Sequence, residues 1–546
     1  MKTRQRTFWV ERSYAISMLV CVLAVVSTLA GCSGPPKLTA EDRRRDIQFL
    51  ADWARHYSPF AELNEKYKNT PSYEALLPRY LEFAEQAETH EEFFQVVNGY
   101  FRVIGATGHF NLYGEEALKW GKIASLLGIV DVDVTSGQFD RGRYWARLSA
   151  KASTRAHPPF HVKFRAGKYF TDDDWEYEGT AIPKGSEILK VDGKTCSEYL
   201  DYVKSETLLK YDAYPKDWVD NWLMIIDEGP SFQGWQVEFG LPDGSVVAAF
   251  APKVDGWPAP KEEPVRTEEP EANCTCLELT DDVGYVRIKS LAAQSIIESL
   301  FEGFVARDRN KIEAFLCRSE GKYRKLIIDL RNNGGGLPRY GYDVLVRPFL
   351  DEPVTFGQVV GIKTKFLTDT DERLLGYFRK YVSTKKEHVV RVEEVQSLEG
   401  FDPNQWTFYE VTRTIKPRHR YNFNGALYFL TNGGCFSATD DTLAAVKRIG
   451  MATIVGRNTA GGAGVYFAPS FIVLPASSMV FRVETDLAIN LDGRVNELFG
   501  TPPDVELPVA DPPKSITKED LLEDEWIKRI LADAEDRTAD GRVEAN

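Results

Sequence analysis

A serine stands at the junction between an apolar segment and a helix-forming segment in the C-terminal half of the chain. Residues 425–431 read Gly-Ala-Leu-Tyr-Phe-Leu-Thr, which predicts a buried strand, and a glycine turn then leads to Ser437. Because the helical pattern begins at Ser437, its hydroxyl lies beside the unpaired amides and the positive dipole end of the first turn. Such a position stabilises the negative oxygen that forms when an acyl group is attacked. Ser437 is therefore the predicted nucleophile of a hydrolase.

Length and charge limit the remaining possibilities. The chain has 546 residues, which is too long for one hydrophobic core and predicts two to four domains. Its net charge is −14, and the short basic run at residues 43–45 is flanked by acidic side chains. A basic stripe of the kind that binds nucleic acid is therefore missing from the sequence pattern. We expect no nucleic-acid partner.

The N-terminus has the pattern of a secretory signal. Four basic residues precede an apolar run over residues 15–30, which is short for a membrane span. The run ends in Leu-Ala-Gly-Cys, which resembles a bacterial lipobox with Cys32 as the lipidated residue. We expect residues 1–31 to be a lipoprotein signal peptide and the mature protein to be anchored to a membrane of the cell envelope, facing the periplasm or in the outer membrane. A plain signal peptide and a short membrane anchor are the alternatives.

The cysteines predict neither a disulfide framework nor a metal site. Five follow Cys32, at positions 196, 274, 276, 317 and 435, and an odd number leaves at least one unpaired. Cys274 and Cys276 lack the second cysteine pair or histidines that a zinc site needs. We expect no metal and no cofactor.

The chain divides into segments of different pattern. Residues 38–120 repeat apolar positions at helical spacing and predict an N-terminal helical domain that carries His109. Short apolar runs between glycine and aspartate turns predict a β-rich domain over 121–251. Prolines and glutamates make 252–272 a stiff linker, and 512–546 is a charged tail with one short helix around 519–533.

Residues 273–511 alternate strand and helix patterns, which predicts an α/β core. The predicted strands are 284–288, 326–330, 427–430 and 453–456. The predicted helices are 293–316 and 437–449. Gly450 follows the last helix at the position that helix ends favour.

Residues 182–195, Ile-Pro-Lys-Gly-Ser-Glu-Ile-Leu-Lys-Val-Asp-Gly-Lys-Thr, resemble the carboxylate-side half of a PDZ domain. In that module a strand and a turn lead into a helix. The resemblance implies that the β-rich domain can take an extended peptide as an added strand. A β-rich spacer without a ligand is the alternative.

A second glycine turn, Asp-Leu-Arg-Asn-Asn-Gly-Gly-Gly at 329–336, follows a buried-looking strand. Glycines let backbone amides approach a reacting oxygen closely, so the amides of Gly335, Gly336 and Ala438 are the expected oxyanion donors. A tight turn that merely needs positive φ is the alternative. A nucleotide-binding loop is excluded, because neither G-x-x-x-x-G-K-[ST] nor G-x-G-x-x-G is spelled there.

A serine nucleophile needs a base. No lysine occurs between Lys447 and Lys514, which argues against a lysine dyad. His109 stands beside a glycine at a turn that ends the helical domain, where a side chain can be presented rather than packed. Glu497 is the candidate carboxylate of a generalised triad. From the residues alone, a structural histidine and a solvated glutamate remain open alternatives, and Asp440 is explained by the dipole of its helix.

Residues 284–508 resemble the catalytic core of the tail-specific, or C-terminal processing, serine peptidases, and in particular the branch that includes the tricorn core protease. The glycine turn at 329–336, the sequence Phe-Ser-Ala-Thr-Asp at 436–440 and Pro503-Asp504 carry the resemblance. It implies a crotonase-like β/α sheet and polypeptide substrates, some of them bound by their C-terminal tails.

The resemblance also assigns roles. In the lysine-using branch the base lies on the loop that here reads Asn-Thr-Ala-Gly-Gly-Ala-Gly, with Gly462 about where the lysine falls. The tricorn-like branch uses a histidine from the helical domain and a glutamate before the final Pro-Asp, which correspond to His109 and Glu497. That branch has a serine before its histidine, whereas this chain has Gly108, and Thr107 is the candidate substitute.

The sequence therefore predicts a lipid-anchored serine endopeptidase. Ser437 is the nucleophile, His109 the general base and then acid, and Glu497 the carboxylate that orients His109. One alternative is a catalytically decayed peptide- or lipid-binding protein on the same scaffold. An esterase or amidase with the same triad is another.

Overall fold

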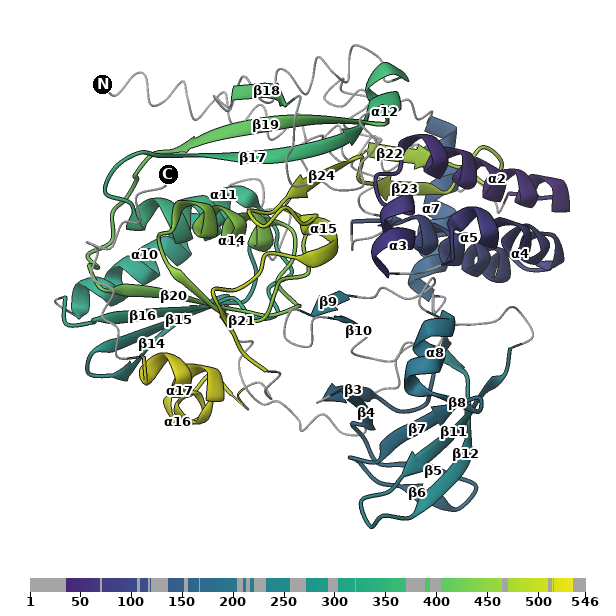
Figure 1. The fold of residues 1–546 in the computed structure, drawn as a ribbon, viewed down its shortest axis with the longest axis horizontal. Coiled ribbons are helices and arrows are strands. Elements are labelled where there is room, and N and C mark those ends of the chain that lie inside the picture. Colours follow the sequence, from purple (N-terminus) through teal and green to yellow (C-terminus); the bar gives the residue numbers. More distant parts are fainter. Residues whose placement is uncertain are drawn as a thin grey trace, which may run out of the picture.

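The computed structural model describes residues 36–68, 71–105, 109–115, 118, 136–151, 156–165, 167–203, 210–212, 217–219, 232–255, 272–292, 303–319, 321–369, 388–392, 404–463, 470–508, 513 and 515–533. The predicted signal peptide with Cys32 lies outside these residues, as do Thr107 and Gly108. Within the described part, an N-terminal helical unit and a β-rich lobe are joined to an α/β core (Figure 1).

Four helices form the front of the helical unit: α2 (Ala40–Tyr57), α3 (Ala61–Lys68), α4 (Tyr73–Gln86) and α5 (His90–Ile104). Helices α2 and α5 each begin with a capping box, in which Thr39 pairs with Asp42 and Thr89 with Glu92. Their apolar faces are buried together, as the helical spacing of the sequence requires. The predicted helical N-terminal region is confirmed.

A further helix, α7 (Ser136–Lys151), lies where the sequence predicted strands. Trp145 packs edge-on against Phe93 of α5 with ring centroids 6.1 Å apart and donates its indole N–H to the carbonyl of Ser477. Helix α7 therefore packs with the helical unit and not with the β-rich lobe. The strand prediction was wrong here because burial against α5, a tertiary contact, selects the helix.

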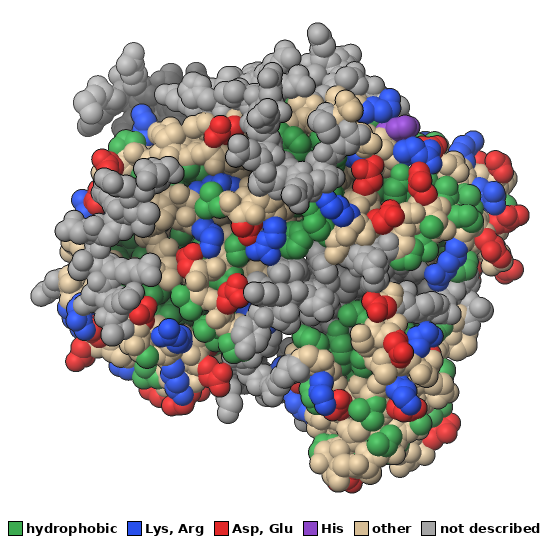
Figure 2. All heavy atoms as spheres, in the orientation of Figure 1, with side chains coloured by type: hydrophobic (Ala, Val, Ile, Leu, Met, Phe, Trp, Pro, Cys, Tyr) green, Lys and Arg blue, Asp and Glu red, His purple; other side chains and the backbone are tan. Residues whose placement is uncertain are grey.

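The β-rich lobe projects from the body at the lower right of Figures 1 and 2. Its strands are β3 (Val162–Arg165), β4 (Lys168–Thr171), β5 (Trp175–Tyr177), β6 (Thr180–Ile182), β7 (Glu187–Val191), β8 (Lys194–Thr195), β11 (Gly234–Gly240) and β12 (Val246–Pro252). The main sheet has the order β12-β11-β7-β4-β3 and encloses a hydrophobic cluster of its own. A turn at 192–193 joins β7 to β8, and α8 (Cys196–Val203) follows directly. The segment that resembles a PDZ motif therefore forms two strands joined by a turn and then a helix.

The core is built on a six-stranded sheet with the order β14-β15-β16-β20-β21-β25. The strands are β14 (Cys274–Thr280), β15 (Val283–Ile288), β16 (Lys325–Asp329), β20 (Ala426–Thr431), β21 (Thr453–Gly456) and β25 (Val505–Glu506). Only the β14–β15 pair is antiparallel, and the other neighbours are parallel. The predicted α/β core is confirmed.

Helices cover both faces of this sheet (Figure 1). One face packs against α10 (Gly303–Arg318), α11 (Pro338–Tyr340), η1 (Gly341–Val346), η2 (Arg347–Phe349) and α14 (Ala438–Ile449). The other packs against α16 (Lys518–Glu523) and α17 (Glu525–Leu531). Residues alternate accordingly along β16, since Leu326 and Ile328 belong to the first layer and Ile327 to the second.

The predicted single tail helix is divided at Asp524, which ends α16 and caps α17. Its side-chain Oδ1 accepts hydrogen bonds from the first amides of α17, those of Trp526 and Ile527. A capping aspartate competes with a continuous helix, which explains the break.

Two further sheets connect the core with the helical unit. The first has the order β18-β19-β17-β24, from β17 (Val354–Lys363), β18 (His388–Val392), β19 (Trp406–Ile415) and β24 (Asp486–Ile489). The second has the order β1-β23-β22, from β1 (Asn111–Leu112), β22 (Ser470–Val473) and β23 (Val480–Val483). Strand β1 follows the N-terminal helices, whereas β22 and β23 belong to the C-terminal part of the core. This small sheet therefore links the two parts of the molecule.

The helical unit and the C-terminal strands share one hydrophobic core. Phe101 of α5 lies against Phe481 of β23 with ring centroids 4.3 Å apart, and Tyr67 contacts Phe499 at 5.3 Å. Asp46 of α2 also accepts the backbone amides of residues 476 and 477, at the tip of the β22–β23 hairpin. This shared core fixes the helical unit on the α/β core.

The remaining elements are α12 (Thr364–Asp369), α15 (Asn496–Phe499), β2 (Ala156–His157), β9 (Lys210–Asp212), β10 (Asp217–Val219) and β13 (Val254–Asp255). Across the described ranges, no helix has both the length and the apolar character needed to span a bilayer. No group of three or more His, Cys, Asp or Glu side chains in the same ranges is placed to hold a metal ion.

Candidate active site

Ser437 occupies a strained turn between β20 and α14. Its φ of 58° and ψ of −123° are unusual for a residue with a side chain, and its hydroxyl does not cap the helix that begins at Ala438. Backbone strain of this kind collects at functional sites, where the surrounding structure enforces it. Here the amide of Ser437 donates to the carbonyl of Gly461, 3.1 Å away, which holds the turn in place. The hydroxyl remains available for another partner.

That partner is His109. Its Nε2 lies 2.8 Å from the Oγ of Ser437, and its Nδ1 hydrogen-bonds with Oε1 of Glu484. An ionised carboxylate can only accept, so Glu484 selects the imidazole tautomer that carries hydrogen on Nδ1. Nε2 is then free to accept the serine hydroxyl proton. The three side chains form the arrangement of a nucleophile, a base and an orienting acid.

Strand pairing brings His109 and Glu484 together. Strands β1 and β23 are antiparallel, with Asn111 opposite Arg482 and Leu112 opposite Phe481. Extending this register by two residues on each strand puts His109 opposite Glu484. Residues that face each other across an antiparallel pair lie close enough for their side chains to interact. The backbone pairing therefore delivers the imidazole to its carboxylate.

The imidazole ring is confined on its other sides. The ring of Phe436 lies 4.4 Å from it between centroids. Gly462 has a φ of +94°, and a Cβ at this position would lie 3.2 Å from Cε1 of His109. A side chain at this position would therefore crowd the ring. The glycine and the histidine are thus mutually compatible.

Glu497 does not take the predicted place beside His109. It lies in α15 and is buried, with Oε2 accepting the amide of Ala488 at 2.9 Å. Its Oε1 has no hydrogen-bond partner within the described part of the chain. Burial and, secondly, the negative charge of Glu484 raise the pKa of Glu497 well above its usual value. Glu497 is therefore a buried neighbour of the carboxylate that contacts the base, in surroundings that favour its neutral form.

Sequence reasoning missed Glu484. It directly follows the apolar strand Val-Phe-Arg-Val of β23, in the sequence Glu-Thr-Asp, where nothing in composition or spacing distinguishes it from a strand-end acid. Its only distinguishing signal is the pairing of β23 with β1. That pairing joins residues more than 360 positions apart and is not encoded locally.

The glycine turn lies directly against the nucleophile. A Cβ on Gly335 would lie 2.9 Å from Cβ of Ser437 and 3.0 Å from the amide nitrogen of Ala438, so only glycine allows this approach. The amide of Gly335, however, already donates to Oδ1 of Asn333 at 3.0 Å. No acceptor is present for the amides of Gly336 and Ala438 within the described residues. These two amides are the better oxyanion candidates.

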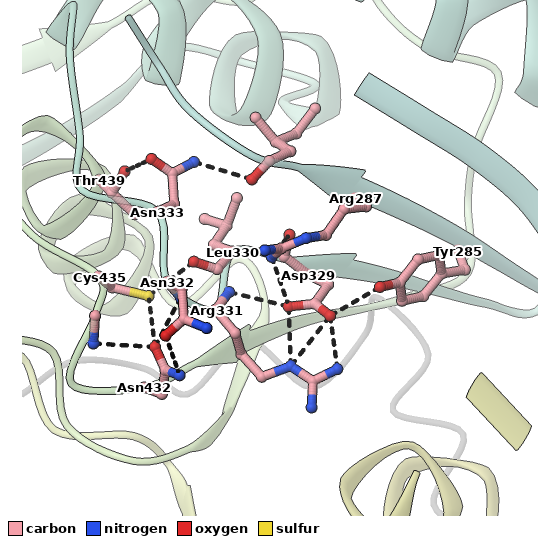
Figure 3. A network of polar contacts seen from close by, with 12 residues as sticks. Tyr285, Arg287, Asp329, Leu330, Arg331, Asn332, Asn333, Asn432, Cys435 and Thr439 are labelled. Atoms are coloured by element: carbon pink, nitrogen blue, oxygen red, sulfur yellow. Dashed lines mark hydrogen bonds and ion pairs between the residues drawn. The ribbon is translucent and has the colours of Figure 1, made fainter. Parts of the chain in front are cut away.

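Asparagine side chains hold the glycine turn and the nucleophile turn together (Figure 3). Oδ1 of Asn333 accepts from the hydroxyl of Thr439 in α14 at 2.8 Å as well as from Gly335, while its Nδ2 donates to the carbonyl of Ile288. Asn432 and Asn332 exchange further hydrogen bonds between the same two turns. These contacts set the distance between Ser437 and the oxyanion amides.

Asp440 lies beneath the same region, one turn into α14. It is fully buried, and its Oδ1 accepts the hydroxyl of Thr459 and the amide of Thr501. Its Oδ2 has no hydrogen-bond partner in the described residues. Burial raises the pKa of Asp440 to about 6. Asp440 thus links α14 to the two segments that contain Thr459 and Thr501. The helix dipole, which the sequence offered as the explanation for Asp440, does not account for these contacts.

Residues 282–507 match the model of peptidase family S41. This part of the chain is a peptidase family S41 domain. The match confirms the resemblance to a serine peptidase family that the sequence motifs indicated, and it supports a serine-type peptidase. No curated protein sequence is similar enough to be matched to the chain.

Solved structures agree with the fold of the peptidase. The structure of mature CPAF complexed with lactacystin has a TM-score of 0.51 at 15% identity, and the match covers 90% of this chain and 98% of that chain. The crystal structure of the tricorn protease has a TM-score of 0.23 at 13% identity, over 81% of this chain and 37% of that chain. This score is too low to support a common fold. At such identities the CPAF likeness concerns the fold alone.

Exchanging the two glutamates separately will distinguish their roles. We expect Glu484→Gln to lower kcat/KM by about 10²–10⁴. A neutral amide cannot stabilise the positive imidazolium of His109, and it does not select one tautomer of the neutral imidazole. Glu497→Gln mimics a protonated carboxyl and keeps an acceptor for Ala488, so we expect a loss at least about tenfold smaller. Steady-state kinetics of the two variants measures this. A larger loss in Glu497→Gln would overturn the assignment of Glu484.

The raised pKa of Asp440 predicts a dependence of stability on pH. Because the folded protein holds the Asp440 proton more tightly than the unfolded chain, ionisation destabilises the fold as pH rises from about 4 to about 6. The free energy of unfolding of Asp440→Asn, minus that of the parent protein, should therefore increase by about 1–3 kcal/mol across this window. Urea denaturation at several pH values measures the difference. A difference that stays constant with pH would contradict the interpretation.

Proposed function

We propose that the protein is a serine endopeptidase in which Ser437 attacks the peptide carbonyl and His109 acts as general base and then acid. Glu484 holds the imidazole in the required tautomer. The observation that carries the proposal is the continuous contact from Ser437 Oγ to His109 Nε2, at 2.8 Å, and from His109 Nδ1 to Glu484. His109 and Glu484 are 5% and 2% exposed, so this relay is shielded from water.

The contacts support a two-stage acyl transfer. His109 removes the proton of Ser437 as the oxygen attacks, and the resulting oxyanion is stabilised by the amides of Ala438 and Gly336. The protonated imidazole then gives its proton to the leaving amine, and an acyl-enzyme forms. In the second stage His109 takes a proton from water as the oxygen of the water attacks the ester. The bond from the acyl carbon to Oγ of Ser437 then breaks, and His109 returns the proton to Oγ.

We extend the proposal to polypeptide substrates that are partly held by the β-rich lobe. Support comes from the strands, turn and helix formed by β7, β8 and α8, whose sequence resembles the carboxylate-side half of a PDZ domain. Such modules add an extended peptide as a strand and hold its terminal carboxylate. Substrates with a free apolar C-terminus are therefore proposed to be cleaved faster than their C-terminal amides.

Replacing the nucleophile tests the activity directly. We expect Ser437→Ala to lower kcat for peptide hydrolysis by about 10⁴–10⁶ without unfolding the protein, since among the described residues the hydroxyl hydrogen-bonds with His109 alone and does not cap α14. A fluorophosphonate probe should label the parent protein at Ser437 and should label neither Ser437→Ala nor His109→Ala. Peptide hydrolysis on a panel of free-acid peptides, their amides and short esters gives the rates.

The panel also separates the rival functions. No hydrolysis and no labelling of the folded parent protein would overturn the peptidase proposal in favour of a binding protein on this scaffold. Hydrolysis of short esters alone would indicate an esterase. Circular dichroism of the Ser437→Ala and His109→Ala variants excludes unfolding as the cause of a loss.

We further propose that the mature protein is anchored through a lipid on Cys32 to a membrane of the cell envelope. The lipobox-like sequence before Cys32 supports this. The carbonyl of Pro36, four residues later, accepts from Nε2 of His90 at 3.0 Å, so the described helical unit begins within about 14 Å of chain from the lipid.

Removing the modified cysteine tests the anchor. We expect Cys32→Ala to lose incorporation of radiolabelled fatty acid and to shift the protein out of the detergent-extracted membrane fraction, while the peptidase activity of the purified protein stays within about twofold, because Cys32 lies far along the chain from the relay. Cys196→Ala is the matched control. Fatty-acid labelling that persists in Cys32→Ala would contradict the anchor.

A further inference from the structure

The helices α16 and α17 lie beyond residue 507, outside the matched family domain, and cover the sheet face opposite to the nucleophile helix (Figure 1). They are well packed there, with Leu521, Trp526, Ile527 and Ile530 buried against the strands. The segment that the sequence indicated as a charged tail is therefore an integral layer of the core. Its position raises the question of what it contributes to the site.

Asp524, between the two helices, reaches the base of the glycine turn. Its Oδ1 caps α17, and its Oδ2 accepts a hydrogen bond from a guanidinium N–H of Arg331 at 2.7 Å. Both side chains are buried, with Asp524 5% and Arg331 7% exposed. Trp526 also lies against Arg331, with the guanidinium carbon 5.5 Å from the ring centroid. A buried charged pair of this kind is disrupted at high cost when one partner is lost.

Arg331 is itself part of the turn that carries the oxyanion amides. Its guanidinium also binds both oxygens of Asp329, and its backbone amide donates to the same carboxylate (Figure 3). Asp329 accepts in addition from Tyr285 and Arg287 on the neighbouring strand. The first residues of the turn are thus held by a buried network whose outermost carboxylate, Asp524, belongs to the C-terminal helices.

Only three residues separate Arg331 from Gly335, which lies against Ser437. The intervening Asn333 amide bonds to the carbonyl of residue 330, and its side chain bonds to Gly335, so the segment has little freedom to absorb a shift at Arg331. A misplacement of about 1 Å among reacting groups can already cost about 10²-fold in rate. A change at Asp524 should therefore be felt at the oxyanion amides.

We propose that Asp524 is a positioning residue for the oxyanion site, through which the C-terminal helices α16 and α17 hold Arg331 and the glycine turn against Ser437. The inference rests on the proposed peptidase function. A segment outside the family domain would then influence the geometry of the transition state through Arg331 and the glycine turn.

Asp524→Asn tests the proposal, because an asparagine oxygen can still cap α17 while the negative charge that faces Arg331 is lost. We expect kcat to fall on the order of tenfold with KM unchanged, which is less than the 10²–10³ for losing one oxyanion donor entirely. The inhibition constant of a peptidyl boronate, which forms a tetrahedral adduct with the serine, should rise in parallel. Glu523→Gln, one residue earlier and exposed with only a surface ion pair to Lys528, is the matched control and should behave as the parent protein.

Two measurements exclude a merely structural effect. Titration of Ser437 with a fluorophosphonate should show the same number of active sites in Asp524→Asn as in the parent protein. Hydrogen–deuterium exchange should be faster in Asp524→Asn over residues 330–337. A loss of active sites in proportion to kcat, or an unchanged kcat and boronate affinity, would overturn the proposal.

The exchange measurement does not depend on activity. If the parent protein neither hydrolyses peptides nor reacts at Ser437 while exchange over residues 330–337 rises in Asp524→Asn, the peptidase proposal fails and the mechanical link from Asp524 to the turn stands. If exchange over these residues is unchanged in Asp524→Asn, the link itself is refuted whatever the activity.

Discussion

The antiparallel pairing of β1 with β23 is the contact on which the active site depends. It joins the end of the helical unit to the C-terminal part of the core, and its register sets His109 opposite Glu484. The shared hydrophobic core around Phe101 and Phe481 supports this pairing from one side. Since a two-residue strand has little stability alone, the packing of the helical unit holds the base in place.

Around this contact, the site is built by excluding side chains as much as by placing them. Gly462 leaves room for the imidazole, and Gly335 leaves room for the backbone of Ser437 and Ala438. The polar groups that remain are tied by Asn333 and its neighbours, so the strained conformation of Ser437 is enforced from several directions. Preorganisation of this kind removes the cost of reorganisation during the reaction.

Buried carboxylates are distributed unevenly around the site. Glu484 contacts the base, whereas burial and the charge of Glu484 raise the pKa of Glu497, because neighbouring buried carboxylates resist ionising together. Asp440 resembles Glu497 in being desolvated, but hydrogen bonds with Thr459, Thr501 and Asn496 limit the rise in its pKa. The choice of the functional glutamate therefore follows from geometry and electrostatics together.

The sequence by itself determined the local elements: the strand, glycine turn and helix around Ser437, the glycine turn at 329–336 and the α/β alternation of the core, since these follow from periodicity and backbone preferences over short stretches. It also singled out His109 as the histidine displayed at a turn. Only the tertiary structure decided that Glu484 and not Glu497 contacts this histidine, that α7 is a helix, and that the tail reaches Arg331. These outcomes depend on pairing and burial between distant segments, which no local pattern of residues records.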